Sequence, residues 1–365
     1  MAFRVSRIFQ SIGIGSVLAG LLIGYPVTAA INFGGDHLRP AWDKQWYAVR
    51  SYLGEPMNDR IIMYQCDWAT AGNILTLKNQ MNEGAGRHRI DEGFKVVGAS
   101  FNDTRTDIGK SAGSNSIMTG FGDFTYFKSG FYVYTSGEKK PNSQQSEVIT
   151  LHLQNERGII ADVDLQILIY ETDKTANLMA DYGNEKIGPN TRINGLGAYQ
   201  TAMTEGAMLI SFVNDDMLVG SDASDAIFSW KGSDRLLGLE GDDFVAGEYG
   251  INFLTGGPGA DHFQLHTDKG QAADLFDTII DYSPDEGDVL NLRPSMMRLW
   301  KGHELDRGTP SQYIWTEASE DHLEVFVRSP SNGGHHHLAR ILAHPGFKPT
   351  QVNIRSLLQS GHIIF

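Results

Sequence analysis

The chain has 365 residues, 41% of them hydrophobic, which is enough for a substantial core and two or three structural units. Its formal net charge of −14, with no basic run, argues against a nucleic-acid partner. Cys66 is the only cysteine, so no intramolecular disulfide can form, and an extracellular fold would need another means of stabilisation, such as bound metal.

Residues 1–29 have the pattern of an export signal. Arg4 and Arg7 precede an apolar stretch from Ile8 to Val27, and small residues at Thr28 and Ala29 favour cleavage there. A retained membrane anchor is the alternative, because the apolar length is close to a bilayer span. No later segment is apolar enough to cross a membrane, so the mature chain is predicted to be secreted.

Residues 31–210 are predicted to form a β-sandwich, of jelly-roll type. Their strongest stretches are FKVVGASF, FTYFKSGFYVY, SEVITLHLQ and IIADVDLQILIYE, which are rich in β-branched and aromatic residues and often alternate. Cys66 fits this picture as a small buried hydrophobe in a strand-like run.

Within this unit, the run YFKSGFYVY followed by SEVITLHLQ resembles the last core strands of jelly-roll alginate lyases. Tyr126, Phe127, Lys128, Gly130 and Tyr132 match the YFKAG-x-YNQ motif of that family. The resemblance implies β-elimination on a uronate polysaccharide, with Tyr132 as the acid or acid/base and Lys128 holding the carboxylate. Alternation would place Tyr132 and Tyr134 on one face, lining a groove.

The other lyase motifs are only partly represented. Gln65 keeps the glutamine of a QIH motif without its histidine, and Arg89 is a faint relative of the arginine-bearing strand. The candidate catalytic residues are therefore Tyr132, Lys128 and Gln65, with Tyr126, Tyr134 and Arg89 as candidate substrate contacts. Two alternatives remain open: the aromatic alternation simply packs a core, or the groove binds a glycan without cleaving it.

A third hypothesis, a serine esterase or lipase, rests on residues 109–113, which fit the G-x-S-x-G motif with Ser111 as nucleophile. That motif requires a hydrophobic strand before it and a helix after it. Neither is indicated here, and no H-E-x-x-H zinc-protease motif occurs.

Residues 211–288 are predicted to form a parallel β-roll. From Ser211 in steps of nine, glycine recurs at the fourth position from the third repeat onward, and an apolar residue recurs at the eighth in all six repeats. The sixth position holds Asp216, Asp225, Asp234, Asp243, Asn252 and Asp261. The segment has 17 acidic residues against three basic ones, so a cation is needed to neutralise it on folding.

Each of these columns has a physical reason. One apolar residue per nine builds a narrow core, glycine gives tight loops, and carboxylates with backbone carbonyls form an oxygen cage suited to Ca²⁺. Because two nonapeptides make one coil, aspartates eighteen residues apart should sandwich ions. The columns resemble the RTX (repeats-in-toxin) family, also described as hemolysin-type calcium-binding repeats, which implies a calcium-dependent β-roll.

Departures from the repeat predict differences among its loops. Asn252 replaces an acid, so its loop is expected to bind calcium weakly. Asp277 and Asp281 follow the last full repeat and are candidates for additional ligands.

Residues 289–365 are predicted to cap the open end of the roll, because a terminal coil leaves unpaired edges. Strands at 322–328 and 335–343 suggest a hairpin. His335, His336 and His337 alternate faces on such a strand and cannot all bind one metal. RTX proteins carry a type I secretion signal at the extreme C-terminus, and residues 355–365 are compatible with one, so the export route stays open.

Together these patterns predict a secreted, calcium-binding RTX protein whose N-terminal sandwich binds or cleaves extracellular polysaccharide. The alternative is a non-catalytic calcium-dependent adhesin or matrix protein.

Overall fold

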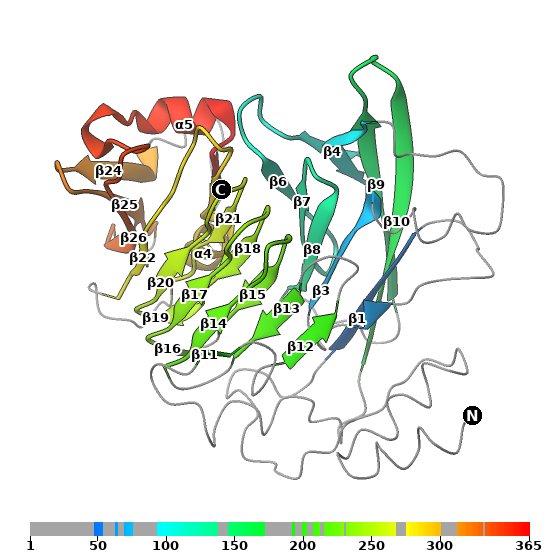
Figure 1. Cartoon of the computed structure of the whole chain (residues 1–365), viewed down its shortest axis with the longest axis horizontal. Coiled ribbons are helices and arrows are strands. Elements are labelled where there is room, and N and C mark those ends of the chain that lie inside the picture. Colours follow the sequence, from blue (N-terminus) through cyan, green and yellow to red (C-terminus); the bar gives the residue numbers. More distant parts are fainter. Residues whose placement is uncertain are drawn as a thin grey trace, which may run out of the picture.

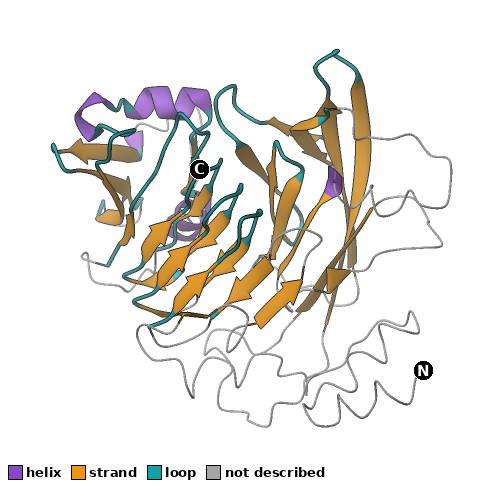
Figure 2. Cartoon of the chain, viewed as in Figure 1, coloured by secondary structure: helices purple, strands orange, loops and turns teal. Residues whose placement is uncertain are grey.

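The structure is a computed structural model. It describes residues 47–53, 63–64, 69–75, 93–137, 145–171, 192–193, 199–202, 207–211, 215–229, 231–267, 275–300, 312–330 and 333–365. Strands dominate these residues, which confirms the all-β prediction (Figure 2). Residues 1–29, Gln65 and Arg89 lie outside the described residues.

The N-terminal unit is a sandwich of two antiparallel sheets. The outer sheet has the order β2 (Met63–Tyr64), β1 (Tyr47–Leu53), β10 (Ile160–Glu171), β9 (Gln145–Gln154), β4 (Lys95–Phe101), β5 (Thr104–Asp107). The inner sheet has the order β3 (Ala69–Asn73), β8 (Phe131–Ser136), β7 (Gly122–Phe127), β6 (Ser114–Met118). Alternate residues meet between the sheets because side chains on a strand point to opposite faces. Ile149 and Leu151 of β9, for example, pack in one cluster with Phe124 of β7.

The repeats form the predicted parallel roll. Its strands are β14 (Met217–Val219), β15 (Ala226–Phe228), β16 (Lys231–Gly232), β17 (Arg235–Leu237), β18 (Phe244–Ala246), β19 (Tyr249–Gly250), β20 (Phe253–Thr255) and β21 (His262–Gln264). Leu218 pairs with Leu236 and Leu236 with Leu254, so successive coils stack at eighteen residues. All six apolar residues of the eighth column are fully buried inside the roll, which is why the sequence keeps that column apolar.

The roll continues at both ends beyond the repeats. The strands before the repeats are β11 (Arg192–Ile193), β12 (Tyr199–Ala202) and β13 (Ala207–Ile210). The strands after them are β22 (Asp277–Ile279), β23 (Val289–Asn291), β24 (Ile314–Ala318), β25 (His322–Arg328), β26 (His335–Leu342) and β27 (Ile363–Ile364). The helices in this part are α4 (Arg293–Leu299), η3 (Pro349–Gln351) and α5 (Ile354–Ser360). β25 and β26 form the predicted hairpin, and β26 pairs with β22 to extend the roll. Two strands that precede residue 211 also pair with roll strands, β11 with β14 and β13 with β15, although their sequences lack the glycine and aspartate columns.

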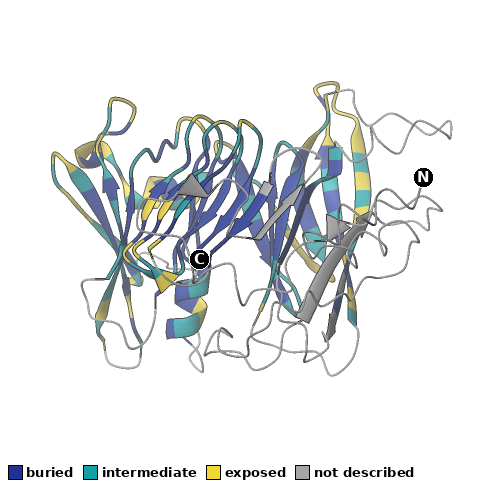
Figure 3. Ribbon diagram, turned by 60° about the horizontal axis from the view of Figure 1, so that its bottom comes forward, coloured by how far each residue is buried: buried dark blue, intermediate teal, exposed yellow. Residues whose placement is uncertain are grey.

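Four β-layers result (Figure 1). We call the seven-stranded roll sheet β12-β13-β15-β18-β21-β23-β27 the docking sheet. The eight-stranded sheet β11-β14-β17-β20-β22-β26-β25-β24 forms the far side of the roll. Phe127, Phe131 and Val133 of the inner sheet share one buried cluster with Phe228 and Phe244 of the docking sheet. The inner sheet is therefore covered on both faces, and buried positions run through the whole stack in Figure 3.

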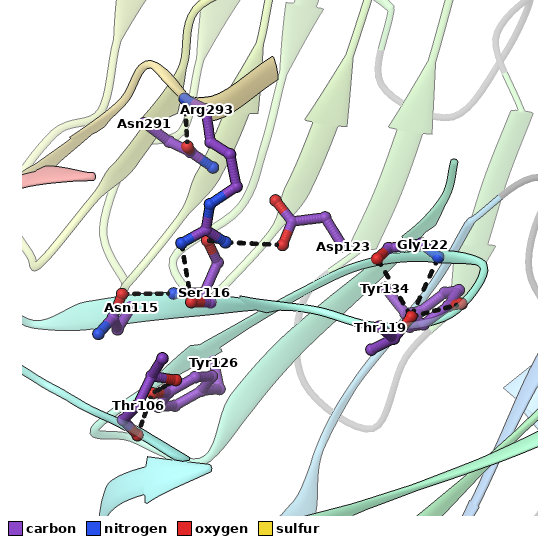
Figure 4. A network of polar contacts seen from close by, with 10 residues as sticks. All are labelled: Thr106, Asn115, Ser116, Thr119, Gly122, Asp123, Tyr126, Tyr134, Asn291 and Arg293. Carbon is purple, nitrogen blue, oxygen red and sulfur yellow. Dashed lines mark hydrogen bonds and ion pairs between the residues drawn. The ribbon is translucent and has the colours of Figure 1, made fainter. Parts of the chain in front are cut away.

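Polar contacts fix the register of the two units (Figure 4). Arg293, the first residue of α4, donates from Nη1 to Ser116 Oγ at 2.7 Å and pairs with Asp123 Oδ1 at 3.1 Å. His262 of the roll lies 2.9 Å from Ser114 Oγ through its Nδ1. Asp123 is largely buried, with 13% of its side chain exposed, and the other groups are buried. The docked arrangement is therefore specified by directional bonds as well as by apolar contact.

Candidate calcium-binding edges of the roll

Aspartates of the sixth column stack into two ladders, one along each edge of the roll. On one edge, the backbone N–H of Asp225 donates to Asp243 Oδ1 at 2.7 Å, and that of Asp243 donates to Asp261 Oδ1 at 2.9 Å. On the other edge, the N–H of Asp216 donates to Asp234 Oδ1 at 2.8 Å. The predicted pairs Asp216/Asp234, Asp225/Asp243 and Asp243/Asp261 therefore come together in neighbouring coils. In each pair, the Oδ1 atom of the aspartate that comes later in the sequence accepts this hydrogen bond and so holds the two coils in register.

The second carboxylate oxygens are what a cation would satisfy. The Oδ2 atoms of Asp234, Asp243 and Asp261 and both oxygens of Asp216 are buried without a hydrogen-bond partner. A buried acceptor that is left unpaired costs on the order of 1–3 kcal/mol, and more when it is charged. An oxygen-seeking divalent ion removes that cost.

Glycines allow carboxylate and carbonyl oxygens of neighbouring coils to approach the loop backbone closely. A Cβ built on Gly238 would lie 2.0 Å from Asp243 Oδ2 and 2.4 Å from the carbonyl oxygen of Gly256. At Gly220 the corresponding distances are 2.4 Å to Asp225 Oδ2 and 2.4 Å to the carbonyl oxygen of Gly238. Carboxylate and carbonyl oxygens thus converge where any side chain would intrude, and this donor set suits Ca²⁺.

The pKa values of the ladder aspartates are raised, so a nearby cation would stabilise their ionised form. Burial, with a smaller contribution from neighbouring aspartates, raises the pKa of Asp216 to about 7 and that of Asp243 to about 9. Burial also raises the pKa of Asp234 to about 6. These shifts show how unfavourable the ionised ladder is when nothing cationic lies beside it.

Within the described residues, no three His, Cys, Asp or Glu side chains gather in a way that could hold a metal by themselves. Backbone carbonyls such as those of Gly238 and Gly256 lie near the carboxylates and could serve as further oxygen ligands.

The Asn252 loop is built differently. Asn252 Oδ1 accepts from the N–H of Asp234 at 3.0 Å and so keeps the ladder. Its Nδ2, however, donates to the carbonyl of Gly247 at 2.6 Å and to Asp277 Oδ1 at 2.8 Å. The amide thus supplies two donors where Asp243 and Asp261 leave an unpaired oxygen, which supports the expectation of weak calcium binding there.

The residues after the repeats take up distinct positions. Asp277 continues one ladder, accepting from the N–H of Asn252 at 3.2 Å, and burial raises its pKa to about 7. Asp281 instead accepts from the N–H groups of Gly256 at 3.0 Å and Gly257 at 2.8 Å, and so caps the last glycine loop.

Asp288 completes the other ladder, although sequence analysis did not single it out. The N–H of Asp261 donates to its Oδ1 at 2.8 Å. It lies 27 residues after Asp261 rather than eighteen, so the two-repeat spacing of successive coils does not lead to it. The available signal was the spacing Asp288-x-Leu290, which repeats Asp261-x-Phe263, and Leu290 pairs with Phe263.

The sandwich candidates lie elsewhere. Tyr126, Tyr132 and Tyr134 are at most 1% exposed and pack between the two sheets of the sandwich. The Tyr126 hydroxyl donates to the Thr106 carbonyl at 2.8 Å, and that of Tyr134 donates to Glu147 Oε2 at 2.6 Å. Burial raises the pKa of both.

These three tyrosines therefore do not line an open groove, in contrast to the sequence expectation. That expectation took one face of the inner sheet to be open, whereas the outer sheet covers one face and the roll covers the other. Lys128 lies in the turn after β7, half-buried, with Nζ 3.4 Å from the carbonyl of Lys110. Burial lowers its pKa.

Comparison with known proteins agrees with the ladder geometry. Residues 213–245 and 237–264 match the family model of the RTX calcium-binding nonapeptide repeat (four copies). This segment thus consists of RTX-type repeats, and the cofactor of such repeats is calcium. No match was found among curated proteins.

Two solved structures are similar to part of the chain. The AlgE6R3 subunit of the Azotobacter vinelandii mannuronan C5-epimerase is 22% identical, with 42% of this chain and 78% of that one covered and a TM-score of 0.28. The AlgE6R2 subunit of the same enzyme is also 22% identical, with 43% and 91% covered and a TM-score of 0.30.

Proposed function

We propose that this chain is an exported protein whose roll folds on binding extracellular calcium and thereby completes the sandwich docked on it. The observation that carries the proposal is the set of buried, unpaired Oδ2 atoms of Asp234, Asp243 and Asp261, which lie close to the glycine backbone of the loops. Calcium supplies charge neutralisation and oxygen coordination at these positions. Among the described residues, no helix is long and apolar enough to cross a bilayer.

The chain's own residues couple calcium to the rest of the fold. Without a cation, the raised pKa values of the ladder oppose compaction at neutral pH, because ionised carboxylates must be buried together. With a cation, the roll can close, and Phe228 and Phe244 then cover Phe127 of the inner sheet. Each ion that binds only the folded form adds about 2.7 kcal/mol at a hundredfold excess over its Kd.

The test is calorimetry and far-ultraviolet circular dichroism on the full chain, first chelated and then titrated with calcium. We expect heat of calcium uptake and a gain of strand signal, both diminished in Asp243→Asn. Asp222→Asn is the matched control, because Asp222 is an exposed repeat residue outside the ladders. An identical spectrum with and without calcium would contradict the proposal.

The finer proposal is that the sandwich binds an extracellular uronate polysaccharide. It is supported by the match of residues 126–132 to the lyase motif and by the half-buried position of Lys128, which leaves part of its side chain at the surface. We propose binding rather than β-elimination, because Tyr132 is only 1% exposed and a polymer cannot reach its hydroxyl.

Alginate retention on affinity gels tests this binding. Lys128→Ala is expected to lose retention, and Lys231→Ala, an exposed lysine of the roll, is expected to keep it. Equal retention of the two variants would refute the role of Lys128. Release of unsaturated uronate, detected by its ultraviolet absorbance, would reinstate the elimination hypothesis.

A further inference from the structure

A serine, a histidine and an aspartate form a hydrogen-bonded chain on the face of the outer sheet that points away from the sandwich core. Ser100 Oγ lies 2.6 Å from His152 Nε2, and His152 Nδ1 lies 2.7 Å from Asp162 Oδ1. The three residues come from adjacent strands β4, β9 and β10. Their neighbours Ala99, Leu151 and Leu165 point into the core, so strand alternation places the chain of polar groups outside.

The order of atoms is what nucleophilic catalysis by serine requires. An aspartate that accepts from Nδ1–H fixes the histidine tautomer whose Nε2 can accept the serine proton. His152 is well covered, with 12% of its side chain exposed, whereas Asp162 is 59% exposed. Ser100 is half-buried, so its hydroxyl is both held and reachable.

A cation lies on the same surface beside the serine. Arg105 of β5 is the register partner of Ser100, and side chains opposite each other on paired strands have neighbouring Cβ atoms. Arg105 is anchored by Asp107, with Nε 2.9 Å from Oδ1, and its side chain is 53% exposed. A guanidinium in this place can stabilise negative charge that develops on an acyl oxygen.

We propose that Ser100, His152 and Asp162 form an active site, which hydrolyses carboxylic esters on the open face of the outer sheet. Ser100 and His152 are the catalytic residues, and Asp162 is the positioning residue. The site is separate from the calcium ladders and from Ser111, which is exposed in the loop between β5 and β6.

The reaction balances with water as the co-reactant. Ser100 Oγ bonds to the acyl carbon as its proton passes to His152 Nε2; the bond from the acyl carbon to the alcohol oxygen breaks, and that oxygen takes the proton. A water oxygen then attacks the acyl carbon and gives its proton to Nε2. The bond from Oγ to the acyl carbon breaks, Ser100 recovers the proton, and a carboxylic acid leaves.

The test uses the full chain in calcium with two probes, a fluorophosphonate and p-nitrophenyl acetate. We expect the fluorophosphonate to label one peptide, the one containing Ser100, and Ser100→Ala to abolish both labelling and hydrolysis. His152→Asn should lower the hydrolysis rate by about 10²- to 10⁴-fold, the usual contribution of a general base. Asp162→Asn should lower kcat while KM and Tm stay unchanged, which a purely structural role would not do.

Thr150→Ala is the matched control, because Thr150 Oγ1 donates to Asp164 Oδ1 at 2.7 Å in a neighbouring hydroxyl–carboxylate pair that has no histidine. It should keep full activity, as should Ser111→Ala. Labelling that persists in Ser100→Ala, or equal hydrolysis by His152→Asn and the unaltered chain, would overturn the proposal. Loss of activity in Ser111→Ala alone would move the nucleophile to the G-x-S-x-G loop and also overturn it.

Discussion

Asn252→Asp should add a calcium site at the Asn252 loop, where the present amide is expected to bind calcium only weakly. Asn252 is completely buried, and its Nδ2 donates two hydrogen bonds, to Gly247 and Asp277. The substitution removes both, at about 1 kcal/mol each. It also buries a carboxylate beside Asp277. We therefore expect the chelated variant to be less stable than the unaltered chain by roughly 3–5 kcal/mol.

Calcium should offset much of this loss. The new carboxylate would present an unpaired oxygen as Asp243 and Asp261 do, and one more ion held at a hundredfold excess over its Kd contributes about 2.7 kcal/mol. Isothermal titration should show one additional ion, and urea unfolding should show a larger calcium-dependent gain in stability. Asp243→Asn makes the opposite exchange on the other edge and should lose an ion. If Asn252→Asp takes up no additional ion and loses no stability under chelation, the reasoning from the amide geometry is refuted.

Three further predictions concern the loops and the interface between the units. Gly238→Ala should abolish the site at Asp243, because its Cβ would lie 2.0 Å from Asp243 Oδ2; titration should show at least one ion fewer. Arg293→Met should cost about 3–5 kcal/mol in urea unfolding, because Asp123 would be left buried without its ion pair, and restoration by Asp123→Asn in the same chain would confirm the cause. Burial lowers the pKa of His262 to about 3, below its ordinary 6.5, so the unfolded chain takes up a proton that the folded chain refuses, and stability falls as pH drops below 6.5. At saturating calcium this amounts to about 2 kcal/mol between pH 7 and pH 5, and His262→Gln should remove that part of the slope.

The roll could be predicted from sequence because each of its coils repeats the same local contacts. The apolar residue of one coil meets its equivalent eighteen residues away, as Leu218 meets Leu236, so a single period encodes both core and ladder. The eighteen-residue spacing fails where a coil of the roll is longer than two repeats. Asp288 was missed for this reason, although it occupies the ladder position after Asp261.

The sequence predicted the fold of the sandwich but not which of its side chains are exposed. Alternation correctly separates Tyr132 from Val133, yet it cannot reveal that a second layer, formed by a distant segment, covers the Val133 face. The contact between Ser100 and His152 could not be predicted from the sequence either. These residues are 52 apart in sequence and meet only through the register of β4 with β9, for which the sequence contains no local signal.

The interface between the inner sheet and the docking sheet links the stability of the sandwich to that of the roll. The inner sheet presents Phe127, Phe131 and Val133 on the face away from the outer sheet, and among the described residues the docking sheet buries this apolar face. A sandwich whose roll has not closed would expose that face, and exposed apolar patches of this kind promote association. If the docking sheet closes only when the ladder carboxylates are neutralised, as proposed above, calcium acts on the sandwich through the interface as well as on the roll. We therefore expect chelation to loosen both units together, and this is the result that distinguishes a docked roll from one attached only by a linker.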